Sequence, residues 1–166
     1  MSADLIRLVI ADDHPIVRAG LVSLLSDEPG LEVVGEGADG EAAVRAVSEL
    51  RPDVVLMDLR MPGVDGAEAT ARIMAGEGQP EGRGPAPRIL ILTTYESDDQ
   101  ILTAVAAGAA GYLLKASPRE EIVAGIRLVA AGQTALSPQV AIRLVERMRK
   151  PAPDLILTSR EVDVLR

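Results

Sequence analysis

The 166-residue sequence contains no cysteine, no phenylalanine and no tryptophan, and it has only two tyrosines. Without cysteine, disulfides and thiolate metal sites are excluded, which is typical of proteins that stay inside the cell. Without large aromatic side chains, the core must be packed from alanine, valine, leucine and isoleucine. The sequence also lacks an apolar run long enough to span a membrane and the apolar core of a signal peptide. We therefore expect a soluble, cytoplasmic protein.

Acidic residues exceed basic ones, and the excess is unevenly distributed along the chain. The net charge of the whole sequence is −8. Residues 1–137 contain 11 Lys and Arg and 21 Asp and Glu, a net charge of −10, whereas residues 138–166 contain 6 and 4, a net charge of +2. This distribution argues against nucleic-acid binding by the acidic part and indicates a second role for the C-terminal part.

Short apolar runs alternate with segments of helical length. We predict strands over 6–11, 31–36, 53–58, 88–94 and 110–115, and helices over 15–26, 40–50, 67–74, 98–107 and 118–131. Asp39 is the expected N-cap of the second helix, and Ser117 with Pro118 the expected start of the fifth. Continuous apolar strands separated by helices are typical of a parallel sheet covered on both faces. The predicted fold class is α/β, a (βα)5 doubly wound sheet of five parallel strands.

Beyond residue 131 the pattern changes. We predict domain boundaries at 1–131, 132–153 and 154–166: a first domain, a helical linker and the truncated start of a second domain. The linker is expected to hold an amphipathic helix over 137–150, with Val140, Leu144 and Met148 on one face. The last segment begins with the capping-box pair Thr158 and Glu161. Within the first domain, the segment 76–88 is rich in Gly and Pro and is expected to be a mobile connection.

Polar side chains follow four of the predicted strands. Asp12 and Asp13 follow the first strand, Asp58 ends the third, Thr93 the fourth and Lys115 the fifth. The carboxyl ends of parallel strands meet at one edge, where ligands bind in such sheets. Three carboxylates packed together repel one another unless a cation joins them. Their oxygen ligands favour Mg²⁺ over Zn²⁺.

This set of residues suits the phosphorylation of a carboxylate. Asp58 would be the nucleophile and Mg²⁺ would neutralise the phosphoryl oxygens, while Lys115 and Thr93 hold them. Each residue alone has a simpler explanation, as a turn cap, a buried hydroxyl or a surface cation, but all five are predicted to meet at one edge. We expect Asp58 to be open to solvent because the turn at 61–63 leads the chain away. His14, directly before a proline, is interpreted as a helix-entry residue.

Four segments, IADDHPIVRAGL, DVVLMDLRMPGVDG, ILTTY and GAAGYLLKASP, resemble the receiver domain of two-component response regulators over residues 5–131. The C-terminal LTSREVDVLR resembles the first helix of a LuxR-type helix-turn-helix domain, as in the NarL/FixJ subfamily. The resemblance implies a regulator rather than an enzyme. It implies phosphorylation by a sensor histidine kinase, control of transcription through a DNA-binding domain that this fragment does not complete, a homodimer promoted by phosphorylation, and no contact with a membrane.

The resemblance also implies roles for individual residues. Asp58 would be the phosphoacceptor, and the implied Mg²⁺ ligands are Asp13, Asp58 and the backbone carbonyl of Arg60, with Asp12 holding a metal-bound water. Thr93 and Tyr112 would form a switch pair, Lys115 would contact the phosphoryl group, and Arg60 and Tyr95 would tune its lifetime. The sequence departs from the family in two places: Ala116 stands where an acid often follows the lysine, and the 76–88 loop is longer than usual.

Two alternatives use the same residues differently. A phosphohydrolase of the haloacid dehalogenase type also needs acids, a hydroxyl and a lysine on a doubly wound sheet, but its nucleophile lies in an Asp-x-Asp after the first strand. Here that position reads Asp12-Asp13-His14. A receiver that acts only as an interaction module, without phosphorylation, is the second alternative. The complete set of five residues favours phosphorylation.

Overall fold

The computed structural model describes residues 5–79, 84–94 and 98–149 of the chain. Its strands are β1 (Ile6–Ala11), β2 (Leu31–Gly37), β3 (Val54–Met57), β4 (Arg88–Thr93), β5 (Gly111–Leu114) and β6 (Ala135–Leu136). Its helices are α1 (Pro15–Ser26), α2 (Gly40–Leu50), α3 (Gly66–Met74), α4 (Asp98–Ala107), α5 (Arg119–Ala130) and α6 (Pro138–Arg149). The five strands and six helices predicted from the sequence are confirmed, with ends that differ by at most one residue.

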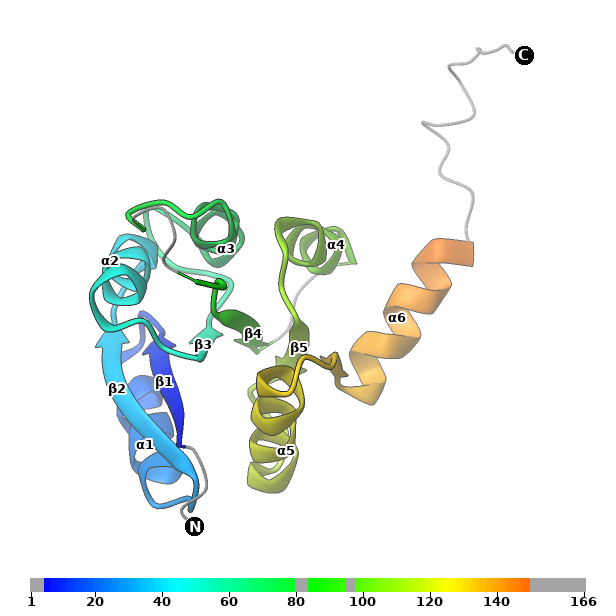
Figure 1. The fold of residues 1–166 in the computed structure, drawn as a ribbon. Helices are drawn as coiled ribbons and strands as arrows, with labels where there is room; N and C mark the ends of the chain where they lie inside the picture. Colours follow the sequence, from blue (N-terminus) through cyan, green and yellow to red (C-terminus); the bar gives the residue numbers. More distant parts are fainter. Residues whose placement is uncertain (1–4, 80–83, 95–97, 150–166) are drawn as a thin grey trace.

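The strands form one parallel sheet in the order β2-β1-β3-β4-β5-β6. Helices α2, α3 and α4 lie along one face, and α1 and α5 lie along the other (Figure 1). Each face has its own apolar cluster, and among the described residues these clusters consist of aliphatic side chains, Met and Tyr112. The doubly wound α/β arrangement is confirmed, and it places the ends of β1, β3, β4 and β5 side by side.

The helix ends show which start signals were interpreted correctly. Asp39 caps α2, and its carboxylate accepts a hydrogen bond from the Ala42 backbone N–H at 2.8 Å. The expected cap of α5 is wrong: the helix begins at Arg119, and Pro118 occupies the N-cap position without a side-chain cap bond. The Ser117 N–H is instead used in a turn and donates to the carbonyl of Leu114 at 3.0 Å.

The sheet continues past residue 131, where the sequence pattern indicated the end of the domain. Ala135 in β6 pairs with Gly111 in β5, which adds a sixth strand to the five expected. Helix α6 then packs against α4. Val140 is 1% exposed and joins the cluster that holds Tyr112 and Ile101. The packed unit therefore includes β6 and α6, which belong to the predicted linker.

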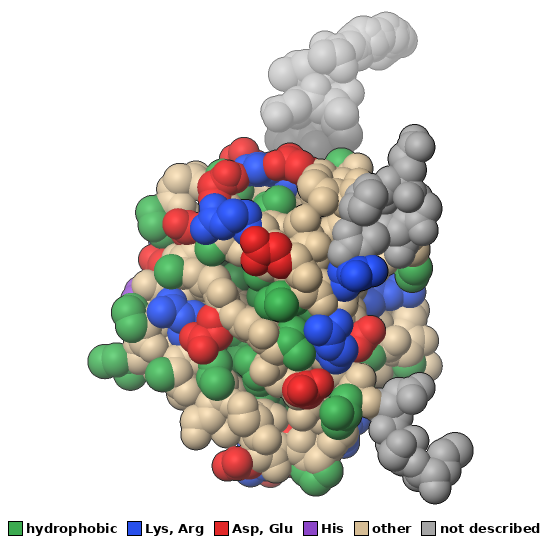
Figure 2. All heavy atoms as spheres, turned by 60° about the vertical axis from the view of Figure 1, so that its left-hand side comes forward, with side chains coloured by type: hydrophobic (Ala, Val, Ile, Leu, Met, Phe, Trp, Pro, Cys, Tyr) green, Lys and Arg blue, Asp and Glu red, His purple; other side chains and the backbone are tan. Residues whose placement is uncertain are grey.

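Several predictions concern residues outside the described part of the chain. They are the capping box at 158 and 161, the second domain at 154–166, the centre of the 76–88 loop at 80–83, Tyr95, and the side chain of Met148. In the ranges that are described, no helix is both long and apolar enough to cross a bilayer. On the face that Figure 2 shows, acidic and basic side chains are interspersed.

Candidate functional site

The sheet hydrogen bonds bring the predicted site residues to one edge. The Asp58 N–H donates to the carbonyl of Ala11 at 2.9 Å, so the residue that follows β3 lies beside the end of β1. The Lys115 N–H donates to the carbonyl of Thr93 at 2.7 Å, so the residue that follows β5 lies beside the end of β4. Asp12 follows β1 directly. The convergence expected from the strand-end positions is thus present in the structure.

Lys115 bridges two of the three acids. Its ammonium lies 2.6 Å from Oδ2 of Asp12 and 3.3 Å from Oδ2 of Asp58. Asp12 is 1% exposed and Asp58 4% exposed, so both ion pairs lie where water screens them little. One ammonium cannot offset the charge of three carboxylates, so the site has room for a further cation.

The remaining negative charge fits a divalent cation. One ligand atom from each of Asp12, Asp13, His14 and Asp58 can be chosen so that all four lie within 4.8 Å of one another. Three of the four are carboxylate oxygens, which are the ligands that Mg²⁺ prefers. The residues present therefore fit the predicted Mg²⁺ site. The participation of the Arg60 backbone carbonyl stays a prediction.

The environment of Asp58 opposes its ionisation. Burial is the largest influence and raises the pKa of the carboxyl above its ordinary value. Lys115 acts in the opposite direction by attraction and hydrogen bonding, while the negative charges of Asp12 and Asp13 raise the pKa further. Because the pKa is raised overall, burial and the neighbouring acids outweigh the single lysine.

The expectation that Asp58 stands open to solvent is wrong. The turn after β3 does not lead away from the sheet, because Leu59 and Met61 fold back and are 5% and 7% exposed. The chain reverses at Gly63, whose φ of +72° favours a residue without a side chain. The Lys115 ammonium lies 3.3 Å from Oδ2 of the carboxylate. A group that reaches Asp58 would therefore meet this ammonium as well.

The two residues expected to act as a switch are both buried. Thr93 at the end of β4 is 1% exposed and Tyr112 in β5 is fully buried. Tyr112 belongs to the same apolar cluster as Ile101 and Ala104 of α4 and Val140 of α6. The site edge, α4 and α6 are therefore connected through one packed region.

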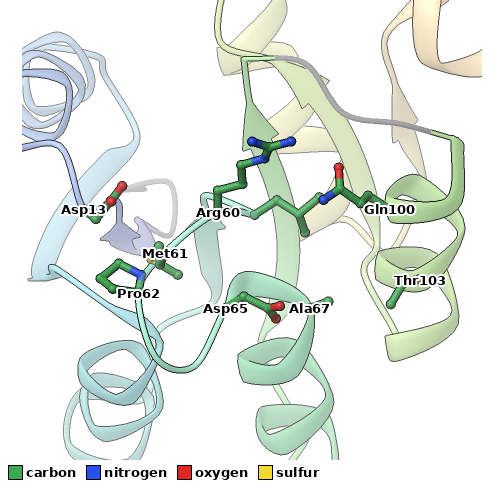
Figure 3. Close-up of a pocket in the computed structure, with 9 residues that line it drawn as sticks. Asp13, Arg60, Met61, Pro62, Asp65, Ala67, Gln100 and Thr103 are labelled. Carbon is green, nitrogen blue, oxygen red and sulfur yellow. The ribbon is translucent and has the colours of Figure 1, made fainter.

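A groove of about 580 Å³ opens beside the acidic cluster. Asp13 lies at one side of it, and Arg60 and Gln100 extend toward each other from the β3–α3 loop and from α4 (Figure 3). Sequence reasoning did not single out Gln100 or Thr103, which also lines the groove. No local pattern marks them, because their position beside the groove depends on where α4 packs.

Arg18 is a third residue that sequence reasoning missed. Its guanidinium donates to the backbone carbonyl of Asp12 at 2.6 Å and pairs with Glu36 at 3.1 Å. It thereby ties α1 to the loop that carries the acids. Its position one helical turn after His14 was the available signal, since α1 begins where that loop ends.

Comparisons with known proteins agree with the site. Residues 8–127 match the family model described as the response regulator receiver domain. The transcriptional regulatory protein LiaR of Bacillus subtilis is 39% identical over 165 residues, which cover 97% of this chain and 75% of LiaR.

Solved structures give the same result. The crystal structure of a LuxR-family two-component response regulator from Aurantimonas sp. SI85-9A1 superimposes with a TM-score of 0.79 at 40% identity, covering 89% of this chain and all of that one. The receiver domain of a NarL response regulator from Mycobacterium tuberculosis gives 0.72 at 38% identity, covering 79% and 100%. Both structures are response regulators of this kind. The chain belongs to the response regulator receiver family and is a two-component response regulator of the NarL/FixJ type.

Proposed function

We propose that Asp58 accepts a phosphoryl group from a sensor histidine kinase and so switches this regulator. The observation that carries the proposal is the position of the Asp58 carboxylate, 3.3 Å from the Lys115 ammonium and among the ligand atoms of Asp12 and Asp13. A carboxylate next to an ammonium and further acids is arranged to receive a dianionic group together with a cation.

The chain's own residues divide the work. Mg²⁺, held by Asp13, Asp58 and the Arg60 carbonyl, with Asp12 holding a bound water, would neutralise charge on the phosphoryl oxygens. Lys115 favours the ionised, nucleophilic form of Asp58 and can then pair with the added oxygens. Thr93 offers its hydroxyl at the end of the neighbouring strand. Arg60, and Tyr95 in the part that is not described, are proposed to tune how long the phosphoryl group persists.

The direct test is the intact mass after incubation with acetyl phosphate and Mg²⁺. We expect the wild-type chain to gain the mass of one phosphoryl group and the Asp58→Asn variant to gain none, because the amide is not a nucleophile of comparable strength. Asp53→Asn, at the opposite end of β3, is the matched control and should be labelled like the wild type. Labelling that persists in Asp58→Asn would assign the reaction to another acid.

We also propose that phosphorylation promotes a homodimer. Helices α1 and α5 cover the same face of the sheet, and they expose Ile16 (87%) and Leu128 (39%). A symmetric pair of copies would remove these side chains from water. Phosphoryl occupancy at Asp58 would be transmitted through Thr93 and Tyr112.

Sedimentation equilibrium with and without beryllofluoride, a phosphoryl mimic, tests this. The mimic should lower the monomer fraction of the wild type, and Ile16→Ser should restore it. Ile142→Ser is the matched control, since Ile142 is 59% exposed on α6, away from the proposed face. A monomer fraction that is the same with and without beryllofluoride would refute a dimer promoted by phosphorylation.

Transcription control is proposed to reside in a LuxR-type domain that begins at residues 154–166, after a linker over 132–153. LiaR is by its name a transcriptional regulator. Helix-turn-helix domains place their recognition helix in the major groove of DNA. The 166 residues do not include that helix. We therefore expect this chain to show at most weak, salt-sensitive DNA binding. A competition gel-shift that reveals sequence preference would contradict this assignment.

A further inference from the structure

We propose that His14 is an additional ligand of the cation site and strengthens its binding of borderline transition ions, such as Ni²⁺, without strengthening its binding of Mg²⁺. The inference rests on the proposed function, because it concerns the cation site next to Asp58. It goes beyond that function by adding a nitrogen donor to a site otherwise made of oxygens, and it reverses the interpretation of His14 as a helix-entry residue alone.

The position of the imidazole carries the inference. Nδ1 of His14 lies 3.0 Å from Oδ1 of Asp13 and 3.3 Å from Oδ1 of Asp12. Its ligand atom belongs to the same group of four within 4.8 Å as those of the three acids. Metal–nitrogen and metal–oxygen bonds of about 2.0–2.2 Å span about this separation across an ion. The ring thus lies where a cation held by the acids would meet it.

The backbone holds His14 in this place. Its N–H donates to Oδ1 of Asp12 at 2.9 Å, which closes a short turn over the acid. His14 is the N-cap of α1 with extended φ and ψ of −95° and 109°, a conformation that the following Pro15 favours. The side chain is 66% exposed, so a hydrated ion can reach it. Little reorganisation is needed before the ring can bind.

The chemistry of the imidazole nitrogen determines which ions bind more tightly when His14 is a ligand. Mg²⁺ prefers oxygen and retains several of its waters, so an imidazole adds little to its affinity. Imidazole suits Ni²⁺, Cu²⁺ and Zn²⁺, for which a mixed set of nitrogen and oxygen ligands is ordinary. His14 should therefore strengthen the binding of these ions without strengthening that of Mg²⁺.

The composition of the chain makes the proposal unusually easy to test. His14 is the single histidine, and the chain has no cysteine. A spectroscopic signal from an imidazole ligand can therefore come from His14 alone, provided that the protein is prepared without a polyhistidine tag. Asn is the substitution of choice because it is a good N-cap residue and should preserve the start of α1.

The experiment is a calorimetric titration of the untagged 166-residue protein and its His14→Asn variant with Ni²⁺ and with Mg²⁺. We expect the variant to bind Ni²⁺ at least about tenfold more weakly and Mg²⁺ within about twofold of the wild type. In electron paramagnetic resonance, bound Cu²⁺ should show nitrogen hyperfine structure in the wild type and lose it in the variant. Equal Ni²⁺ affinity in the two proteins would overturn the inference, as would an equal loss of Ni²⁺ and Mg²⁺ affinity.

A second variant separates this inference from the proposed function. Asp13→Asn should weaken the binding of both Ni²⁺ and Mg²⁺, because Asp13 is a proposed ligand of either ion. If the wild type binds Mg²⁺ and is phosphorylated on Asp58 but His14→Asn leaves Ni²⁺ binding unchanged, the inference about His14 alone fails. If the wild type binds neither ion and gains no phosphoryl mass, the cation site itself is refuted, and the inference falls with it. The melting temperatures of the metal-free variants check that both are folded.

Discussion

Replacing Gly66 by alanine is expected to destabilise the protein by about 3 kcal/mol, a large loss for a domain of this size. A Cβ at this position would lie 2.3 Å from the backbone oxygen of Asp58 and 2.8 Å from Cα of Leu59. Both are backbone atoms, which cannot rotate away as the end of a side chain can. The helix α3 begins at Gly66, whose N–H donates to the carbonyl of Leu59 at 2.8 Å. The added methyl group must therefore push α3 away from the residue that carries the proposed reaction.

Urea unfolding of the two proteins, with acetyl phosphate labelling alongside, measures both consequences. Labelling of Gly66→Ala should fall because the Asp58 backbone is displaced. Gly20→Ala is the matched control: its Cβ in α1 would meet none of the described heavy atoms within 4 Å. There the exchange should stabilise the helix by about 0.5–1 kcal/mol. A Gly66→Ala variant as stable as the wild type would show that α3 is not held against β3 in this way.

Replacing Asp58 by asparagine is expected to raise the stability of the metal-free protein at neutral pH. The folded state raises the pKa of Asp58, chiefly through burial, so the ionised form is less stable in the fold than in the unfolded chain. A carboxyl of this kind favours the fold fully below its unfolded pKa, near 3.8, and loses that contribution as the pH rises through its folded pKa. Asn keeps the shape and cannot ionise, so its melting temperature in EDTA should be higher and should lack this pH dependence.

Mg²⁺ should reverse the order of the two proteins. A cation that binds only the folded wild type stabilises it by about 1.4–2.7 kcal/mol at 10–100 times the dissociation constant. The variant has lost one carboxylate ligand and should respond less. Thermal unfolding in EDTA and in a Mg²⁺ series tests both statements. Glu32→Gln is the control because it removes one charge from an exposed position of β2. If Glu32→Gln in EDTA gains as much stability as Asp58→Asn, the total charge of the chain is responsible and not the site.

The helices and strands were predictable because each was encoded locally. Apolar runs of strand length and helices with a clear polar face alternate without ambiguity. β6 was missed because it has two residues and therefore no periodicity. It exists because Gly111 allows a close approach: a Cβ there would lie 2.6 Å from the carbonyl of Ala135. That fit depends on two segments far apart in the sequence, and local patterns do not report it.

The candidate site was predictable in part: which residues meet followed from the sequence, and how they are buried did not. Parallel strands must bring their carboxyl ends to one edge, so the meeting of Asp12, Asp58 and Lys115 followed from their positions. The burial of Asp58 did not follow, because it depends on how Met61 folds back and on which acid Lys115 contacts. The contact of the His14 imidazole with Asp12 and Asp13 was equally hidden, since the ring could point either toward solvent or toward the acids.

The packing of β6 and α6 onto the receiver has a practical meaning for anyone who exchanges domains between regulators. The sequence pattern suggests a splice point near residue 131, yet a hybrid joined there would discard Ala135 and Val140, which are 3% and 1% exposed. The α4 surface that Val140 covers would then face whatever the new partner domain supplies. A junction after α6, at Arg149 or later, transfers the receiver together with the helix that packs against α4.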